Sequence, residues 1–392
     1  MVLFQRMMDR VSSSPRAIES SFALAREFDV APSKLDDLFG DHAHLTPGEW
    51  LRRMRIRSSA RDLLNAELEI ADVGESLGFA DSSAFQQEFL GRMRMSPGDY
   101  RALNASRGFS LVLPAGYRAD EILAYHARDP QSQSERSEDN RIWKALATPD
   151  GAAILELTLG DGQAAVRFHS DAKIGRKSMA GLHAAALRIL GLENDVSEFE
   201  RSHAAFARPR RGLRVALLPT SFDALCWAII GQQINLRFAS ALRREMIALA
   251  GERIAHMRAH PTPEAVANLD ASELLSRRYS RSKARYLIDA ARAAATGALD
   301  IENLTNTSAI AAEMALVAQR GIGLWTARYV LMRSGFADAA PVGDSGLAAA
   351  LQRLHDLPER PNADQTARLM SRFAPHRGLA SGHLWASLKD AV

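Results

Sequence analysis

This sequence of 392 residues has a single cysteine, Cys226, and no long hydrophobic run. One thiol excludes an internal disulfide, a cysteine-rich zinc site and an iron–sulfur cluster, which needs about four thiolates. Charges interrupt the apolar runs within about a dozen residues, whereas a membrane span needs about 20. Arg6, Asp9 and Arg10 follow Met1 too closely for a secretory signal. We expect a soluble, cytoplasmic protein without membrane contact.

The net charge is small, +3, and unevenly distributed. Residues 1–106 carry 13 Lys and Arg against 16 Asp and Glu, so the remaining residues carry a net charge of +6. Attraction to nucleic acid is therefore expected from the later residues. Apolar residues make up 47% of the chain, which is ample for ordinary cores, and the length predicts two or three domains.

Hydrophobic periodicity divides the chain into three parts. Residues 1–106 have a helical pattern, 107–175 change to the period of two that is typical of strands, and 176–392 return to a helical pattern. We take these ranges as the predicted domains. The predicted fold class is mainly α with a smaller α+β domain, which holds a small antiparallel sheet.

Two details of the middle part are specific. Phe109 to Leu113 is a strand candidate, and residues 152–169 predict a hairpin that turns at Gly160-Asp-Gly162. The polar run from Gln131 to Asn140 predicts a loop.

A glycine pair marks the third part. Gly321 and Gly323 flank Ile322 between two helical patterns, so backbone N–H groups can approach a phosphate while the apolar side chain anchors the turn. Asp344 follows in Pro341-Val-Gly-Asp-Ser-Gly-Leu347. This pattern is typical of a helix-hairpin-helix, and the acid nearby indicates chemistry on DNA.

The motifs of residues 107–392 resemble the helix-hairpin-helix DNA glycosylases, and within them the AlkA-type 3-methyladenine DNA glycosylases. Besides the hairpin, the matching motifs are Ala228 to Ile234, His260 to Pro263, Ser282 to Tyr286, Pro375 to Arg377 and His383 to Trp385. The resemblance implies a monomeric glycosylase II type enzyme that flips alkylated purines out of double-stranded DNA and hydrolyses their N-glycosidic bonds in base excision repair.

By this resemblance Asp344 is the catalytic carboxylate. Breaking an N-glycosidic bond builds positive charge on the sugar, and a fixed carboxylate stabilises that charge or orients the attacking water. The alternative is an ordinary helix-capping aspartate. Lyases of the superfamily carry a Schiff-base lysine two residues after the second hairpin glycine. Trp325 occupies that position, so we expect no lyase activity.

Aromatic residues are expected to form the base pocket. Trp325, Tyr329 and Trp385 match pocket aromatics of the family, and electron-rich ring faces favour a cationic alkylated base. The alternative is that these rings belong to the core. The residue expected to fill the gap left by the flipped base follows Gly231-Gln232, where the family has an apolar residue. Here Gln233 takes that place, so either Gln233 or Ile234 is the expected wedge.

Phosphate contacts are expected from the hairpin. The resemblance assigns them to the N–H groups of Gly321 and Gly323 and to the Thr326 hydroxyl. Family members often hold a monovalent cation, Na⁺ or K⁺, on hairpin carbonyls, which here belong to Val317, Gln319 and Gly321. No other cofactor is expected.

Residues 1–106 resemble an AraC-type domain with two helix-turn-helix units, with matching motifs at Gly78 to Phe85 and Ser96 to Arg101. No cysteine precedes Cys226, so the thiolate methyl acceptor of adaptive-response regulators is missing. Asp36 and Asp37 on the first candidate recognition helix would repel DNA. We expect a degenerate, largely structural domain.

One observation keeps DNA binding by this domain open. Arg52, Arg53, Arg55 and Arg57 lie on one short helix and could contact phosphates. The alternative function is a regulator of an alkylation response, which would bind promoter DNA through the N-terminal domain while the glycosylase-like half only senses damage.

Overall fold

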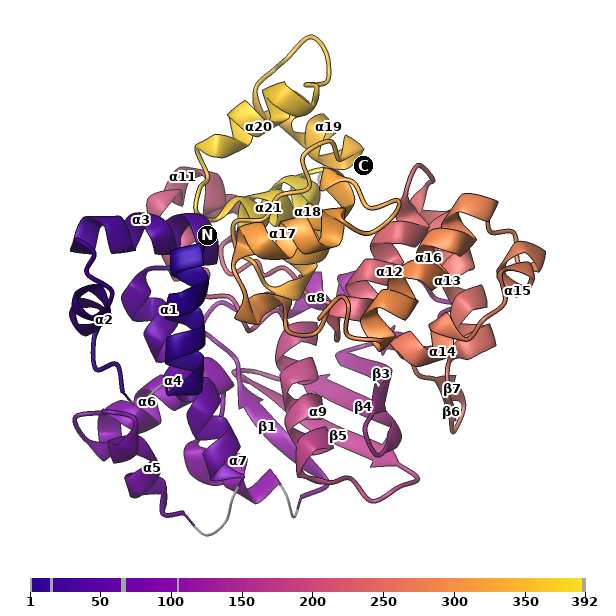
Figure 1. The fold of residues 1–392 in the computed structure, drawn as a ribbon. Coiled ribbons are helices and arrows are strands. Elements are labelled where there is room, and N and C mark those ends of the chain that lie inside the picture. Colours follow the sequence, from indigo (N-terminus) through magenta and orange to yellow (C-terminus); the bar gives the residue numbers. More distant parts are fainter. Residues whose placement is uncertain (1, 15–16, 65–67, 104–105, 390–392) are drawn as a thin grey trace.

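The computed structural model describes residues 2–14, 17–64, 68–103 and 106–389 (Figure 1). The described chain is largely helical, with one five-stranded antiparallel sheet and one two-stranded ribbon. The predicted fold class, mainly α with a smaller α+β part, is confirmed. None of the described helices is both long and apolar enough to cross a bilayer.

The N-terminal helices repeat one local design. They are α1 (Val2–Ser13), α2 (Ser21–Glu27), α3 (Pro32–Ala43), α4 (Pro47–Leu63), α5 (Ile70–Ser76), α6 (Ser82–Met93) and α7 (Pro97–Ala102). α3 and α6 each end before a left-handed residue, His44 and Arg94, with φ of 58° and 59°. The next helix then starts with a proline behind an N-capping hydroxyl, from Thr46 or Ser96. The two predicted helix-turn-helix units are therefore present.

The sheet contains the predicted hairpin and two strands that the sequence did not reveal. Its order is β1-β5-β4-β3-β2, with β1 (Gly108–Val112), β2 (Glu135–Glu138), β3 (Arg141–Thr148), β4 (Gly151–Leu159) and β5 (Gln163–Ser170). The predicted loop at Gln131 to Asn140 is wrong, because β2 lies inside it. Its polar character misled because Glu135 is largely buried, between the ammonium of Lys144 and the guanidinium of Arg243.

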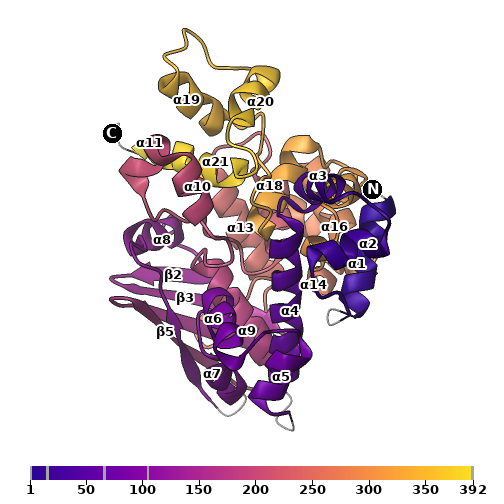
Figure 2. The ribbon, with the colours of Figure 1, turned by 90° about the vertical axis from the view of Figure 1, so that its left-hand side faces the viewer.

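One hydrophobic core joins the second helix-turn-helix unit to the sheet. Figure 2 shows α6 and α7 beside α9 and the sheet. α9 (Arg176–Ile189) packs on β3 and β4, while α8 (Ala119–His126) packs against β2 and β3. On α9, the His183 ring lies 5.0 Å from that of Tyr100 and 2.9 Å, at Nε2, from the Met93 carbonyl. The packing is thus continuous across residues 106 and 175, where the sequence places domain boundaries.

The C-terminal part is a helical assembly around α12, α16 and α18. Its elements are α10 (Ser197–Ser202), α11 (Ala204–Ala207), η2 (Arg208–Arg210), α12 (Ser221–Gly231), α13 (Leu236–Ala250), β6 (Arg253–Ile254), β7 (Met257–Arg258), α14 (Pro263–Ala267), α15 (Ala271–Ser276), α16 (Arg281–Ala295), η3 (Leu304–Asn306), α17 (Ala309–Val317), α18 (Leu324–Ser334), α19 (Ser345–Leu354), α20 (Ala363–Ser371) and α21 (Arg377–Ser387).

The first helix-turn-helix unit docks on this assembly beside α17 (Figure 1). His42 Nδ1 lies 2.9 Å from the Ser308 hydroxyl. Arg57 donates to the Asn306 side chain at 2.6 Å, and Arg55 donates to the carbonyls of Ile18 and Glu19. Two of the four arginines considered for phosphate contacts, Arg55 and Arg57, are therefore hydrogen-bonded within the protein.

Candidate active site

The hairpin between α17 and α18 depends on one glycine. Gly321 has φ of 80°, and a Cβ there would lie 2.3 Å from Cδ2 of Tyr286. Conformation and packing both exclude a side chain at this position. Ile322 is buried and anchors the turn, whereas Gly323 caps α18 with open space around its Cα. The exposed backbone at Gly323 is therefore accessible to a ligand.

Gln232 fastens the hairpin to the end of α12. Its Nε2 donates to the Gly321 carbonyl at 2.9 Å and to the Thr326 hydroxyl at 3.0 Å. Thr326 is buried. The structure thus gives the Thr326 hydroxyl oxygen an internal donor, and phosphate binding by Gly321, Gly323 and Thr326 stays a prediction.

The turn after α12 presents the two wedge candidates differently. Gln233 is exposed with φ of 56°, while Ile234 packs partly into the core and lines the neighbouring cleft. Leu236, for which the sequence indicated no role, is 55% exposed and lines the same cleft. Gln233 and Leu236 are therefore both exposed at this turn, as are the polar residues Asn235 and Arg237.

Lys283 stabilises that turn through hydrogen bonds to backbone carbonyls. Its ammonium group donates, at 2.6 to 3.2 Å, to the carbonyls of Ile229, Ile230 and Gln232. These carbonyls lie at the C-terminal end of α12, where a cation is favoured, and that of Ile229 also accepts the Gln232 N–H. Burial lowers the pKa of Lys283. The sequence contained this residue in the Ser282 to Tyr286 motif but offered no reason for it.

The three predicted pocket aromatics lie together in a cleft of about 560 Å³. The rings of Trp325 and Tyr329 stack at 5.7 Å, and those of Tyr329 and Trp385 lie 6.4 Å apart. Trp227 donates from its indole to the Tyr329 hydroxyl at 3.0 Å. Tyr329 is mostly buried, while Trp325 and Trp385 are partly open to the cleft.

Asp344 lies at the same cleft, at the N-terminus of α19. Its Oδ1 accepts from the Leu347 N–H at 2.8 Å and from the Trp385 indole at 3.0 Å. Within the described ranges, no donor bonds Oδ2. Asp344 therefore caps a helix, as the alternative in the sequence analysis supposed, and also keeps one carboxylate oxygen available at the cleft.

A buried arginine lies behind the aromatic rings. Arg333 is 5% exposed, and its Cζ lies 5.4 Å from the Tyr329 ring and 5.6 Å from the Trp385 ring. Burial works against its charge, but Tyr125, Tyr329 and Asp344 together raise the pKa of Arg333. Nothing in the sequence indicates this position, because an arginine in the last turn of a helix usually faces solvent.

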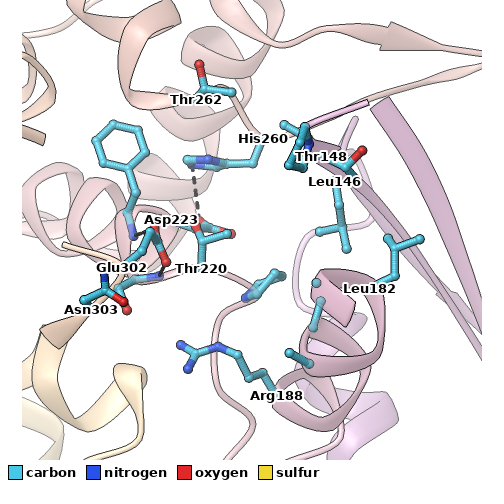
Figure 3. Close-up of a pocket in the computed structure, with 18 of the residues that line it drawn as sticks. Leu146, Thr148, Leu182, Arg188, Thr220, Asp223, His260, Thr262, Glu302 and Asn303 are labelled. Atoms are coloured by element: carbon cyan, nitrogen blue, oxygen red, sulfur yellow. Dashed lines mark hydrogen bonds and ion pairs between the residues drawn. The ribbon is translucent and has the colours of Figure 1, made fainter. Parts of the chain in front are cut away.

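A larger cavity, about 1210 Å³, lies elsewhere (Figure 3). None of the predicted site residues lines it. At its edge the Asp223 carboxylate accepts two hydrogen bonds from Arg243, and His260 Nε2 lies 3.3 Å from Asp223. Since Arg243 also pairs with Glu135, this network ties the sheet to the helical assembly.

Among the described residues, no group of acidic, histidine or cysteine side chains is suited to hold a metal ion. Of the carbonyls considered for a monovalent cation, that of Gln319 accepts the Ile322 N–H and that of Gly321 accepts Gln232. A carbonyl has two lone pairs, so each keeps one for a cation.

Fold and site together define a helix-hairpin-helix DNA repair protein. Residues 226–376 match the HhH-GPD superfamily base excision DNA repair protein family, and residues 24–103 match a helix-turn-helix domain family. The chain belongs to the HhH-GPD superfamily of base excision DNA repair proteins, with an AraC-type helix-turn-helix domain at its N-terminus.

Two curated relatives and one solved structure support this assignment. The DNA-3-methyladenine glycosylase of Bacillus subtilis is 29% identical over 71% of this chain and 96% of its own. The putative DNA-3-methyladenine glycosylase YfjP of the same organism is 30% identical over 50% of this chain and 70% of its own. A 3-methyladenine DNA glycosylase from Archaeoglobus fulgidus shares the fold, with a TM-score of 0.63 and 19% identity over 71% of this chain and 97% of that chain.

Proposed function

We propose that this protein is a monofunctional DNA glycosylase that hydrolyses the N-glycosidic bond of alkylated purines of the 3-methyladenine class. The observation that carries this proposal is the Asp344 carboxylate, which has one oxygen anchored and one oxygen free beside an aromatic cleft. The names of the two Bacillus relatives support the substrate class.

Asp344 supplies the electrostatic part of the mechanism. As the bond to the base breaks, positive charge develops on the sugar, and the free oxygen stabilises it or orients the attacking water. The bonds from Leu347 and Trp385 fix the other oxygen, so the carboxylate does not have to reorganise during the reaction. Arg333 adds a buried positive charge behind the rings.

The aromatic cleft supplies the binding part. A purine alkylated at a ring nitrogen is cationic, and the faces of Trp325 and Trp385 attract it with about 0.5 to 2 kcal/mol. Gln233 or Leu236 fills the space that the flipped base leaves in the duplex. The N–H groups at Gly321 and Gly323 bind a backbone phosphate, and a monovalent cation held by the carbonyls of Val317, Gln319 and Gly321 would add positive charge there.

The lysine positions support hydrolysis without strand cleavage. Trp325 stands where a Schiff-base lysine would be needed. Lys389 also lines the cleft, but it is largely exposed and its ammonium group pairs with Glu121 at 3.1 Å. Trp325 has no amine and the amine of Lys389 is paired, so neither residue offers an unpaired amine to the sugar.

Base release from alkylated duplex DNA tests the proposal. We expect the purified protein to release methylated purines and to leave abasic sites that break only after alkali treatment. Asp344→Asn should abolish release while binding DNA as the wild type does. Asp270→Asn, at the N-cap of α15, changes a helix-capping carboxylate away from the cleft and should remain active. Release by Asp344→Asn at the wild-type rate would refute the catalytic role, and borohydride trapping of a protein–DNA adduct would refute hydrolysis without lyase chemistry.

A further inference from the structure

A second cavity, about 680 Å³, separates the N-terminal helices from the segment between α9 and α10. We call it the arginine cavity. Its arginines come from α4, from the end of α6 and from the segment before α12, and they are Arg52, Arg53, Arg57, Arg92, Arg94 and Arg214. Its carboxylates are Glu49, Glu88, Glu193 and Asp195. The lining therefore carries two more positive than negative side chains.

Most of these arginines have partners within the protein. Arg92 donates to Glu49 at 2.9 Å and to Glu88 at 2.6 Å, and Arg52 also donates to Glu49. Arg57 is bonded to Asn306, as described above. Arg214 donates to the Asn194 carbonyl at 2.8 Å.

Arg53 and Arg94 differ from the others. In the part of the chain that the structure describes, no acceptor bonds the guanidinium of either residue, and Arg94 Nε is fully buried without a partner. Glu193 and Asp195 act on them only through space, because Glu193 lies 3.4 Å from Arg188 and Asp195 accepts from the Ser197 N–H. Among the described residues, neither guanidinium group thus forms an ion pair, although these carboxylates lie near enough to act on it.

The surroundings of Arg53 and Arg94 lower the pKa values of both residues. Burial, followed by repulsion from Arg57, lowers the pKa of Arg53 to about 10. Burial and the nearby charge of Arg214 lower the pKa of Arg94. Both residues stay protonated at neutral pH, but the charge of each is costly in this cavity. An anion bound here would remove that cost.

We propose that the arginine cavity binds a phosphate monoester dianion through Arg53 and Arg94. A monoester carries a charge of about −2 near neutral pH, which matches the excess of the lining. Guanidinium groups bind the oxygens of such an anion through paired N–H donors. A phosphodiester within a DNA strand carries only one charge and fits the excess less well. The monoester can come from a free nucleotide or from the 5′-phosphate of a DNA end.

Thermal unfolding and calorimetry of the full chain test this site. Inorganic phosphate and dAMP should each raise the unfolding midpoint in a saturable way, relative to chloride at the same ionic strength. Arg53→Gln combined with Arg94→Gln should weaken binding by about tenfold or more per arginine, since a charged hydrogen bond contributes about 1.5–3 kcal/mol. Arg26→Gln removes an exposed charge from α2 and should bind phosphate normally.

The unfolding midpoint of the double variant without phosphate shows whether Arg53 and Arg94 serve ligand binding or the stability of the fold. Because the two arginines lack partners, their replacement should leave the unfolding midpoint in chloride unchanged or raise it. A lower midpoint in chloride would mean that they stabilise the fold, and that result would overturn the proposal. A wild-type midpoint that phosphate does not change, or an equal phosphate effect in the double variant, would also overturn it.

Two duplexes that differ only in a 5′-phosphate or a 5′-hydroxyl identify the source. Tighter binding of the phosphorylated duplex that disappears in the double variant assigns the site to DNA ends. Equal binding of both duplexes, together with a saturable effect of dAMP, assigns it to free nucleotides.

Discussion

The Trp385 indole has two tasks at the cleft, because it forms part of the aromatic wall and also donates to Asp344 Oδ1 at 3.0 Å. Trp385→Phe keeps a ring and removes the donor. A hydrogen bond to a charged group contributes about 1.5–3 kcal/mol, so we expect base excision to slow by roughly tenfold to a hundredfold in single-turnover assays. Trp227→Phe removes a neutral bond to Tyr329 and should have a smaller effect. Wild-type rates in Trp385→Phe would show that the indole does not position the carboxylate.

A substitution at Gly346, in the first turn of α19, should affect excision by Asp344 without lowering the stability of the protein. A Cβ at this position would lie 3.1 Å from Asp344 Oδ1 and 3.4 Å from Cδ1 of Trp385. In Gly346→Ala the helix gains up to about 1 kcal/mol of propensity, while the carboxylate has to move. We expect an unfolding midpoint close to or above that of the wild type, with clearly reduced excision. Gly181→Ala, in an open position on α9, should add stability and leave excision unchanged.

For single residues, the sequence predicted which residues belong to the site better than it predicted the contacts between them. Asp344, Trp325, Tyr329 and Trp385 were predicted from their match to family motifs, and they line one cleft although they come from α18, α21 and the N-terminus of α19. Arg333 was missed because two of the three aromatic rings around it, those of Tyr125 and Trp385, come from distant parts of the chain, and only Tyr329 lies on the same helix. Local pattern contains no information on the two distant contacts.

The turn after α12 is the element that would enter the duplex. Gln233 and Leu236 project from it, whereas Ile234 is partly packed in the core. We expect Gln233→Ala and Leu236→Ala each to reduce base flipping without loss of stability, and Ile234→Ala to lower the unfolding midpoint. Fluorescence of 2-aminopurine beside the lesion measures flipping, and calorimetry measures stability. Full flipping in the double Gln233→Ala, Leu236→Ala variant would exclude this turn as the wedge.

Elements differ in how far their own residues determine them. The β4–β5 hairpin was predictable because Gly160-Asp-Gly162 separates two alternating runs, and Gly162 has φ of 71°. β2 was not, because the inward position of Glu135 is stable only with the charges of Lys144 and Arg243 beside it. A buried ion network makes a strand resemble a loop in sequence.

Across the whole molecule, three buried histidines couple stability to pH. Burial lowers the pKa values of His183, His260 and His383 to about 4. As the pH falls, these histidines are protonated in the unfolded chain before they are protonated in the folded one. Their contribution to the free energy of unfolding is therefore fully present above about pH 6.5 and is lost as the pH falls toward 4. We expect the unfolding midpoint to decrease over this range. His183→Gln should flatten the dependence, and His169→Gln, at an exposed position, should not. Parallel curves for wild type and His183→Gln would contradict this origin.

The N-terminal units act in the whole molecule as part of the core. Tyr100 and the Met93 carbonyl contact His183, and the Arg94 carbonyl accepts from Val112 of β1 at 2.7 Å. Removal of residues 1–106 would expose the apolar face of α9 and one side of the sheet, at about 1.5–3 kcal/mol for each large side chain. We expect residues 107–392 alone to unfold at a lower temperature and to aggregate, as measured by calorimetry and light scattering. In the full chain, Tyr100→Ala should lower the midpoint while each folded molecule keeps wild-type excision, because the cleft is untouched. A truncated protein with the wild-type midpoint would show instead that the two halves are independent, and the helix-turn-helix units would then need a purpose other than packing.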